Sequence, residues 1–272
     1  MEIDFISDIH LDFYLNVAAE GKIRKFIESI LPKEKSKILI IAGDIGHNNG
    51  QNKIFLKILK GYYKHIFLTY GNHDLYLLSK NTQKKFEWNS FERIEDLKNI
   101  CLELGIFFMD GNVVEVEGIT IGGLPGWYEM EVADLGYWKQ TMNDSVHIYT
   151  TYPICLPYSN EKYKGFCPVS FWEKQKELLE KMPKVDILFS HIAMYEMKDK
   201  HMNPKYIGDP DNMFYFRTKG GYDLIKNKTK NYIFGHTHNI YSYEDEDIFF
   251  ACNPLGYPGD LNTTIKTLKI IK

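Results

Sequence analysis

The chain has 272 residues and a formal net charge of −3, and 44% of its residues are hydrophobic and 15% aromatic. This composition allows a large α/β core in one domain over residues 1–272, and it gives no indication of nucleic-acid binding, although that remains possible. No run approaches the ~18 apolar residues of a membrane helix. The start lacks a signal-peptide pattern and the four cysteines are widely spaced, so we expect a cytoplasmic protein with no membrane partner.

Hydrophobic runs that are almost free of charge predict five buried strands, at residues 3–6, 38–41, 66–69, 185–189 and 232–234. Amphipathic patterns predict crossover helices at residues 22–31 and 53–63 between the first three strands. The later part of residues 75–104 is expected to be helical, residues 106–124 to form three short strands, and the C-terminal part to alternate in the same way. The pattern predicts a mostly doubly wound α/β fold.

Each of the five predicted strands is followed directly by a short polar cluster. The clusters are Ser7-Asp8-Ile9-His10, Gly43-Asp44, Gly71-Asn72-His73-Asp74, Ser190-His191 and Gly235-His236-Thr237-His238. Because ligands collect at the carboxyl ends of strands in α/β sheets, these clusters can converge on one crevice. Five of the nine histidines fall in them.

Imidazole and carboxylate ligands together suit Mn²⁺, Fe²⁺ or Zn²⁺, whereas Ca²⁺ and Mg²⁺ favour oxygen ligands and structural Zn²⁺ favours thiolates. No cysteine occurs in any cluster. A bridging carboxylate holds two ions about 3.5–4 Å apart, which suits displacement at phosphorus. Asp44, in the middle of the set, is the natural bridge, so the sequence predicts a site for two divalent ions.

The series Asp-x-His, Gly-Asp, Gly-Asn-His-Asp, His and Gly-His-x-His resembles the calcineurin-like metallophosphoesterase superfamily, and it runs from residue 8 to residue 238. The resemblance implies an α/β/β/α sandwich in which two face-to-face mixed β-sheets are flanked by helices. It implies one metal held by Asp8, His10, Asp44 and His238. It implies a second metal held by Asp44, Asn72, His191 and His236.

The resemblance also implies hydrolysis in one displacement by a hydroxide between the metals, with His73 and Asp74 as catalytic residues. We expect His73 to protonate the leaving group or stabilise phosphoryl charge, oriented by a hydrogen bond to Asp74. The remaining histidines are expected to lie outside the site. Among them is His47, which follows Asp44 by three residues and is more often a solvated loop residue.

Two aromatic-rich stretches, residues 127–168 and 195–217, are expected as insertions that form a cap over the metals or a satellite core, or both. They contain Trp127, Tyr152, Tyr158, Tyr195 and Tyr215, among others. Together with Met142-Asn143-Asp144 and the segment at residues 253–257, they look like a bacterial or phage-type branch of the superfamily.

Three functional hypotheses remain open. The first is a phosphodiesterase on a small nucleotide-like diester, because aromatic rings near the metals could stack on a base. The second is a phosphomonoesterase on a small metabolite, and the third is a catalytically silent metal-binding scaffold. A phosphoprotein phosphatase is doubtful, because Gly43-Asp44 does not continue to the Asp-Arg-Gly of those enzymes. The oligomeric state is left open.

Overall fold

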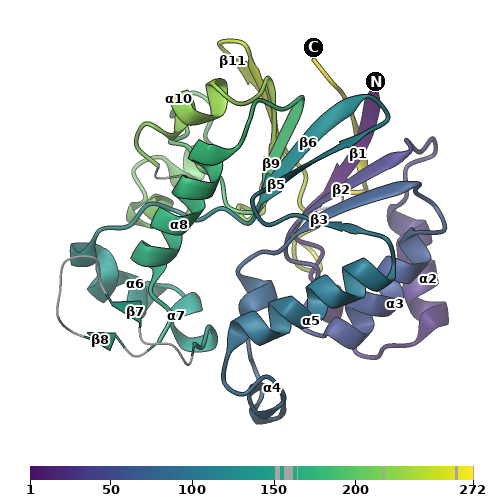
Figure 1. Ribbon diagram of the computed structural model, residues 1–272, viewed down its shortest axis with the longest axis horizontal. Helices are drawn as coiled ribbons and strands as arrows, with labels where there is room; N and C mark the ends of the chain where they lie inside the picture. The colour runs from purple at the N-terminus through teal and green to yellow at the C-terminus, as the bar shows by residue number, and fades with distance from the viewer. Residues whose placement is uncertain (151–153, 156–161, 164, 217, 261–262, 272) are drawn as a thin grey trace.

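The computed structural model describes residues 1–150, 154–155, 162–163, 165–216, 218–260 and 263–271. Within them, two mixed β-sheets lie face to face and helices cover both outer faces (Figure 1). The predicted fold class is therefore confirmed. None of the described helices combines the length and the apolar character needed to span a membrane.

The first sheet has the strand order β13-β1-β2-β3-β4, with β1 to β4 parallel and β13 antiparallel to β1. Its strands are β1 (Glu2–Ile6), β2 (Ile38–Ala42), β3 (His65–Thr69), β4 (Phe107–Phe108) and β13 (Lys266–Lys269). The helices of this half are α1 (Leu11–Tyr14), α2 (Glu20–Ile30), α3 (Asn49–Leu59), α4 (Lys80–Lys85) and α5 (Ser90–Glu103).

The helix α3 begins four residues earlier than expected, because the side chain of Asn48 caps it by accepting hydrogen bonds from the backbone N–H of Gly50 and Gln51. It also ends before Gly61, which has low helix propensity.

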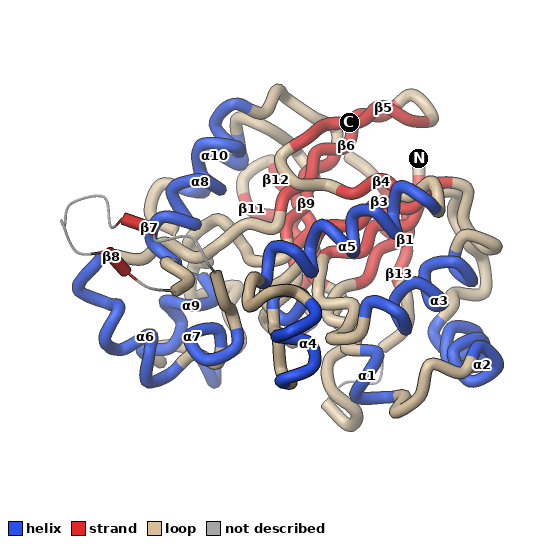
Figure 2. Tube along the Cα trace, turned by 60° about the horizontal axis from the view of Figure 1, so that its bottom comes forward, coloured by secondary structure: helices blue, strands red, loops and turns tan. Residues whose placement is uncertain are grey.

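The second sheet has the order β11-β12-β10-β9-β6-β5, with a parallel centre and antiparallel edge strands. Its strands are β5 (Asn112–Val116), β6 (Ile119–Leu124), β9 (Ile187–Ser190), β10 (Asn231–Phe234), β11 (Tyr241–Asp245) and β12 (Ile248–Cys252), while β7 (Ile154–Cys155) and β8 (Lys162–Tyr163) pair separately. The helices are α6 (Leu135–Thr141), α7 (Asp144–His147), α8 (Pro168–Lys181), α9 (Met213–Phe216) and α10 (Gly221–Lys226). Figure 2 shows them gathered on the side opposite to α2, α3 and α5.

The central strands are buried on both faces, which explains why their sequences are continuous hydrophobic runs. In β2, Ile38 and Ile40 pack into the core between the two sheets, while Leu39 and Ile41 pack under the helices of the first half. The second sheet alternates in the same way, and its outer face belongs to a large aromatic core. The N-terminus lies at the top of Figure 1, so the carboxyl ends of the parallel strands point down toward α6 and α7.

Candidate metal centre

The five polar clusters lie next to one another, although they follow strands of two different sheets. Three of them follow β1, β2 and β3, and two follow β9 and β10. Backbone hydrogen bonds join neighbouring loops: the N–H of Asp8 donates to Gly43 O at 3.0 Å, and the N–H of Gly235 donates to His191 O at 2.8 Å. The two sheets build the site together, because the N–H of His236, after β10, donates to Asp8 Oδ1, after β1, at 3.0 Å.

One group of possible ligands contains Asp8, His10 and His238, whose nearest ligand atoms lie within 4.8 Å of one another. His10 Nε2 lies 3.0 Å from His238 Nε2, and His238 Nε2 lies 3.5 Å from Asp8 Oδ1. Burial opposes ionisation of Asp8, but the hydrogen bond to His238 and nearby imidazoles outweigh it and lower the pKa of Asp8 to about 2. Asp8 is therefore ionised, and it lies close enough to Asp44 for the two carboxylates to interact.

The other group surrounds Asn72. Its side-chain oxygen Oδ1 lies 3.1 Å from His191 Nε2 and 3.2 Å from His236 Nδ1. Asp44 Oδ2 lies 3.2 Å from His191 Nε2 and 3.9 Å from His10 Nε2, so this carboxylate stands between the two groups, as a bridging ligand would. The structure thus brings together all seven side chains that the sequence analysis expected as ligands.

The ring nitrogens are presented as a metal would require. His191 donates its Nδ1 proton to Ala42 O at 2.8 Å, and His236 donates its Nε2 proton to Phe214 O at 3.2 Å, so in each ring the other nitrogen faces the site and offers a lone pair when the ring is neutral. His10 and His238 point Nε2 atoms at each other, a contact that a cation between them would satisfy. The residues present therefore fit divalent metals.

The metal-free arrangement also perturbs protonation. Burial opposes the charged form of His191, but the Asp44 carboxylate outweighs burial and raises the pKa of His191 to about 9. Burial and the charge of His191 lower the pKa of His236 to about 3. Metal binding must displace the proton from His191, because the ligand is the neutral imidazole.

The backbone of the site is conformationally demanding. Five residues of the site have positive φ angles, between 45° and 68°. They are Asp8, His10, Asp44, His236 and His238. Such strain concentrates at functional sites. Gly71 has no room for a side chain, because a Cβ there would lie 2.2 Å from Asp44 Oδ1.

Asp144, to which the sequence analysis gave no role in the site, orients Asn72. Its fully buried carboxylate accepts hydrogen bonds from Asn72 Nδ2 at 2.8 Å, from the Tyr76 hydroxyl at 2.6 Å and from the Tyr128 hydroxyl at 2.9 Å. Because the amide nitrogen of Asn72 is engaged in this way, its oxygen must face the metal site. Asp144 begins α7 in the first insertion, and the Met142-Asn143-Asp144 motif in the sequence did not indicate that its carboxylate reaches a metal-site residue.

His73 does not form the expected hydrogen bond with Asp74. The Asp74 carboxylate instead accepts from the backbone N–H of Asp44 at 2.8 Å and of Gly71 at 2.9 Å, and it braces these two loops. Burial and the Asp44 charge raise the pKa of Asp74 to about 6. The physical reason is direction: the short turn His73–Leu75 points the Asp74 side chain inward under the loops, away from the ring of His73.

The partner of His73 is His47, so the expectation that His47 is a solvated loop residue is wrong. His47 Nε2 lies 3.1 Å from His73 Nδ1, and His47 Nδ1 lies 2.6 Å from Asp12 Oδ2. The side chain of His47 is only 10% exposed. Two signals were present in the sequence: His47 follows Asp44 on the same loop, and Asp12 follows His10.

A cavity of about 280 Å³ lies over the clusters. Its walls include metal-site residues, His73 and a ring of tyrosines and small polar residues, and no lysine or arginine occurs among the described residues that line it. Those contributed from outside the motif loops are Tyr76, Thr141, Met142, Asn143, Tyr206, Tyr215 and Tyr257.

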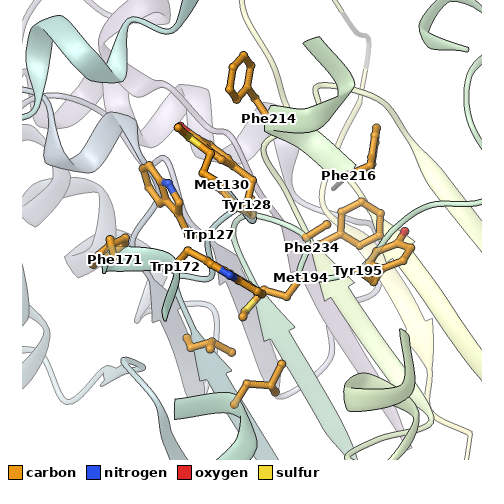
Figure 3. Close-up of a cluster of buried hydrophobic side chains, with 14 of the residues drawn as sticks. Trp127, Tyr128, Met130, Phe171, Trp172, Met194, Tyr195, Phe214, Phe216 and Phe234 are labelled. Carbon is orange, nitrogen blue, oxygen red and sulfur yellow. The ribbon is translucent and has the colours of Figure 1, made fainter. Parts of the chain in front are cut away.

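The aromatic insertions divide between the two expected roles. Tyr206 and Tyr215 line the cavity, whereas Trp127 and Tyr195 are fully buried in the outer core of the second sheet, as Figure 3 shows. Tyr152 and Tyr158 lie outside the described residues. The insertions also reach the metal site itself, through Asp144 and through the carbonyl of Phe214.

Comparison with known proteins agrees with this geometry. Residues 1–239 match the family described as calcineurin-like phosphoesterase. The uncharacterized protein L509 of Acanthamoeba polyphaga mimivirus is 22% identical over 272 residues, which cover 95% of this chain and 92% of that protein. The crystal structure of the phosphopantetheinyl hydrolase PptH from Mycobacterium tuberculosis superposes on this chain with a TM-score of 0.69 and 16% sequence identity. The superposition covers 95% of this chain and 90% of the PptH chain.

Proposed function

The chain belongs to the calcineurin-like phosphoesterase family and is a metal-dependent phosphoesterase, and from that premise we propose that it hydrolyses small, singly charged phosphodiesters. The observation that carries the proposal is the charge of the cavity. Its described lining has no lysine or arginine, the side chains that proteins use to grip phosphate oxygens.

The charge balance supports a diester over a monoester. Two dications would bring about four positive charges, and the two ligand carboxylates, Asp8 and Asp44, together with an activated hydroxide would offset about three of them. The surplus of about one positive charge matches the single charge of a diester better than the double charge of a monoester. The tyrosines of the cavity wall would accommodate a base or another flat group.

We assign the metal ligands as the sequence suggested. Asp8, His10, Asp44 and His238 would hold one ion, and Asp44, Asn72, His191 and His236 the other; the mixed ligands suit Mn²⁺, Fe²⁺ or Zn²⁺. When bound, the ions would supply Lewis acidity and an activated water. His73, at the cavity wall, would protonate the leaving oxygen through Nε2.

The scaffold alternative is less well supported. A scaffold with a closed cleft has no use for a cavity of about 280 Å³ over its ligands.

The described free cysteines, Cys101, Cys167 and Cys252, are buried, which supports a reducing, cytoplasmic compartment. The bacterial or phage-type branch stays a prediction.

The deciding experiment compares kcat/KM for bis(p-nitrophenyl) phosphate and p-nitrophenyl phosphate on one preparation, with its metal content measured. A higher value for the diester is expected, and a higher value for the monoester would favour the alternative. Asp44→Asn should lose at least one ion and the activity. Asp186→Asn, which changes a carboxylate that bonds to Thr120 at the far end of β9, should keep both.

A further inference from the structure

Three side chains form a hydrogen-bonded row that ends at the cavity. Asp12 Oδ2 lies 2.6 Å from His47 Nδ1, His47 Nε2 lies 3.1 Å from His73 Nδ1, and His73 Nε2 faces the cavity, 3.4 Å from the Tyr257 hydroxyl. We propose that Asp12 and His47 are positioning residues that hold His73 with its Nδ1 proton directed at His47 and its Nε2 directed at the leaving group. This inference rests on the proposed function.

The direction of the row follows from the proton inventory. The Asp12 carboxylate only accepts, and it receives both the backbone N–H of His47 at 2.9 Å and the ring Nδ1–H. When the His47 ring holds only this Nδ1 proton, its Nε2 has a lone pair that accepts the Nδ1 proton of His73. The remaining nitrogen of His73, Nε2, is free to carry the proton that is transferred.

The proposed proton transfer from His73 to the leaving oxygen conserves atoms and charge. As the bond between phosphorus and the leaving oxygen breaks, its electron pair moves to that oxygen, which takes the Nε2 proton of protonated His73. His73 is left neutral and keeps its Nδ1 proton. The proton that the attacking water loses restores the charge, so no other reactant is needed.

The row is fixed from behind by a buried arginine. Arg93 donates from Nη2 to Gly46 O at 2.6 Å and from Nη1 to His73 O at 3.0 Å, so it ties the loop that carries His47 to the loop that carries His73. The Tyr76 ring packs against both imidazoles, with centroid distances of 5.9 Å to His47 and 4.4 Å to His73. The rings are therefore held in place independently of any metal.

The kinetic test uses two diesters that differ in their need for an acid. Bis(p-nitrophenyl) phosphate releases a stable anion, whereas thymidylyl-thymidine releases an alkoxide that must be protonated. His47→Ala should lower kcat about 10–100-fold on the dinucleotide, a part of the about 10²–10⁴-fold effect of a positioned acid, and should affect the activated diester much less. His47→Gln, whose amide oxygen can accept from His73 Nδ1, should recover part of the loss.

The control is His65→Ala, because His65 lies at the start of β3 and contacts Glu117 at 3.3 Å, away from the site. It should leave both rates and the metal content unchanged. In a His73→Ala background, His47→Ala should change kcat by no more than about twofold, since His47 acts through His73. Three outcomes would overturn the proposal. They are an equal fold-loss of kcat on both diesters in His47→Ala, a further loss of kcat when His47→Ala is added to His73→Ala, and a loss of metal from His47→Ala.

A measurement independent of turnover separates this proposal from the proposed function. In the zinc-loaded protein, ¹⁵N–¹H spectra of the imidazoles should show His73 as the Nδ1–H tautomer, assigned by its disappearance in His73→Ala. His47→Ala should shift it toward the Nε2–H form. A wild-type protein that hydrolyses neither diester would refute the function only, whereas an Nε2–H tautomer in the wild type would refute the row.

Discussion

Replacing Asp144 by Asn tests whether the first insertion controls the metal site. The substitution keeps the shape of the side chain but removes its charge. Its amide oxygen can still accept from Asn72 and Tyr76, while its NH₂ group meets the Tyr128 hydroxyl, which already accepts the Nε1–H of Trp138 at 2.6 Å. The Tyr128 proton then has no acceptor.

The magnitude follows from these contacts. Bonds to a charged acceptor are worth about 1 kcal/mol more than neutral ones, so the Asn72 bond alone accounts for about fivefold in metal affinity. Loss of a negative charge beside the ions adds to this, and changes behind a metal ligand commonly cost about 10–100-fold. We expect a loss in that range, together with about 1–3 kcal/mol of stability from the unpaired hydroxyl.

The assay is competition for Zn²⁺ with a chromophoric chelator, alongside thermal unfolding of the metal-free protein. Asp4→Asn is the matched control, because the Asp4 carboxylate is also fully buried and also accepts three hydrogen bonds, from Tyr63, Ser36 and Thr267. It should lower stability and leave metal affinity unchanged. If Asp144→Asn also kept its affinity within about twofold, the orienting role would be refuted.

Three further outcomes are expected. His73→Ala should retain both metals and lose about 10²–10⁴-fold in kcat on an alkoxide-releasing diester, and loss of a metal would instead make it a ligand. Because the pKa of His191 is raised to about 9, its protonation stabilises the metal-free protein fully below pH 6.5, and this contribution should disappear as the pH rises through about 9. The free energies of unfolding of wild type and His191→Gln, measured by urea titration, should therefore converge at high pH. A constant difference between the two proteins at every pH would contradict the assignment. Tyr215→Leu should raise KM for nucleotide-like diesters at unchanged metal affinity, because Tyr215 lines the cavity. Trp127→Leu should lower the melting temperature at unchanged KM, because Trp127 packs in the core. A raised KM in Trp127→Leu with no effect of Tyr215→Leu would mean that Trp127, and not Tyr215, contacts the substrate.

Much of the fold and of the metal site could be predicted because each strand end combines a hydrophobic run, which indicates a buried strand, with a polar residue directly after it, which indicates a ligand. Buried strands such as Ile38–Ala42 are hydrophobic on every residue, and the polar residue that follows each run stands out against it. The residues expected as ligands, from Asp8 to His238, therefore lie together as the motifs indicated. Their roles as ligands, and the organisation as one domain, stay predictions.

The tertiary structure decided what the side chains around the ligands do. The strand-end motifs do not reveal that Asp144 reaches Asn72, 72 positions earlier in the chain, or that Trp127 turns into the core while Tyr215 faces the cavity. The pairing of His73 with His47 in place of its sequence neighbour Asp74 has the same origin. Motifs record which chemistry a strand end carries, whereas orientation depends on packing between segments that only the folded chain brings into contact.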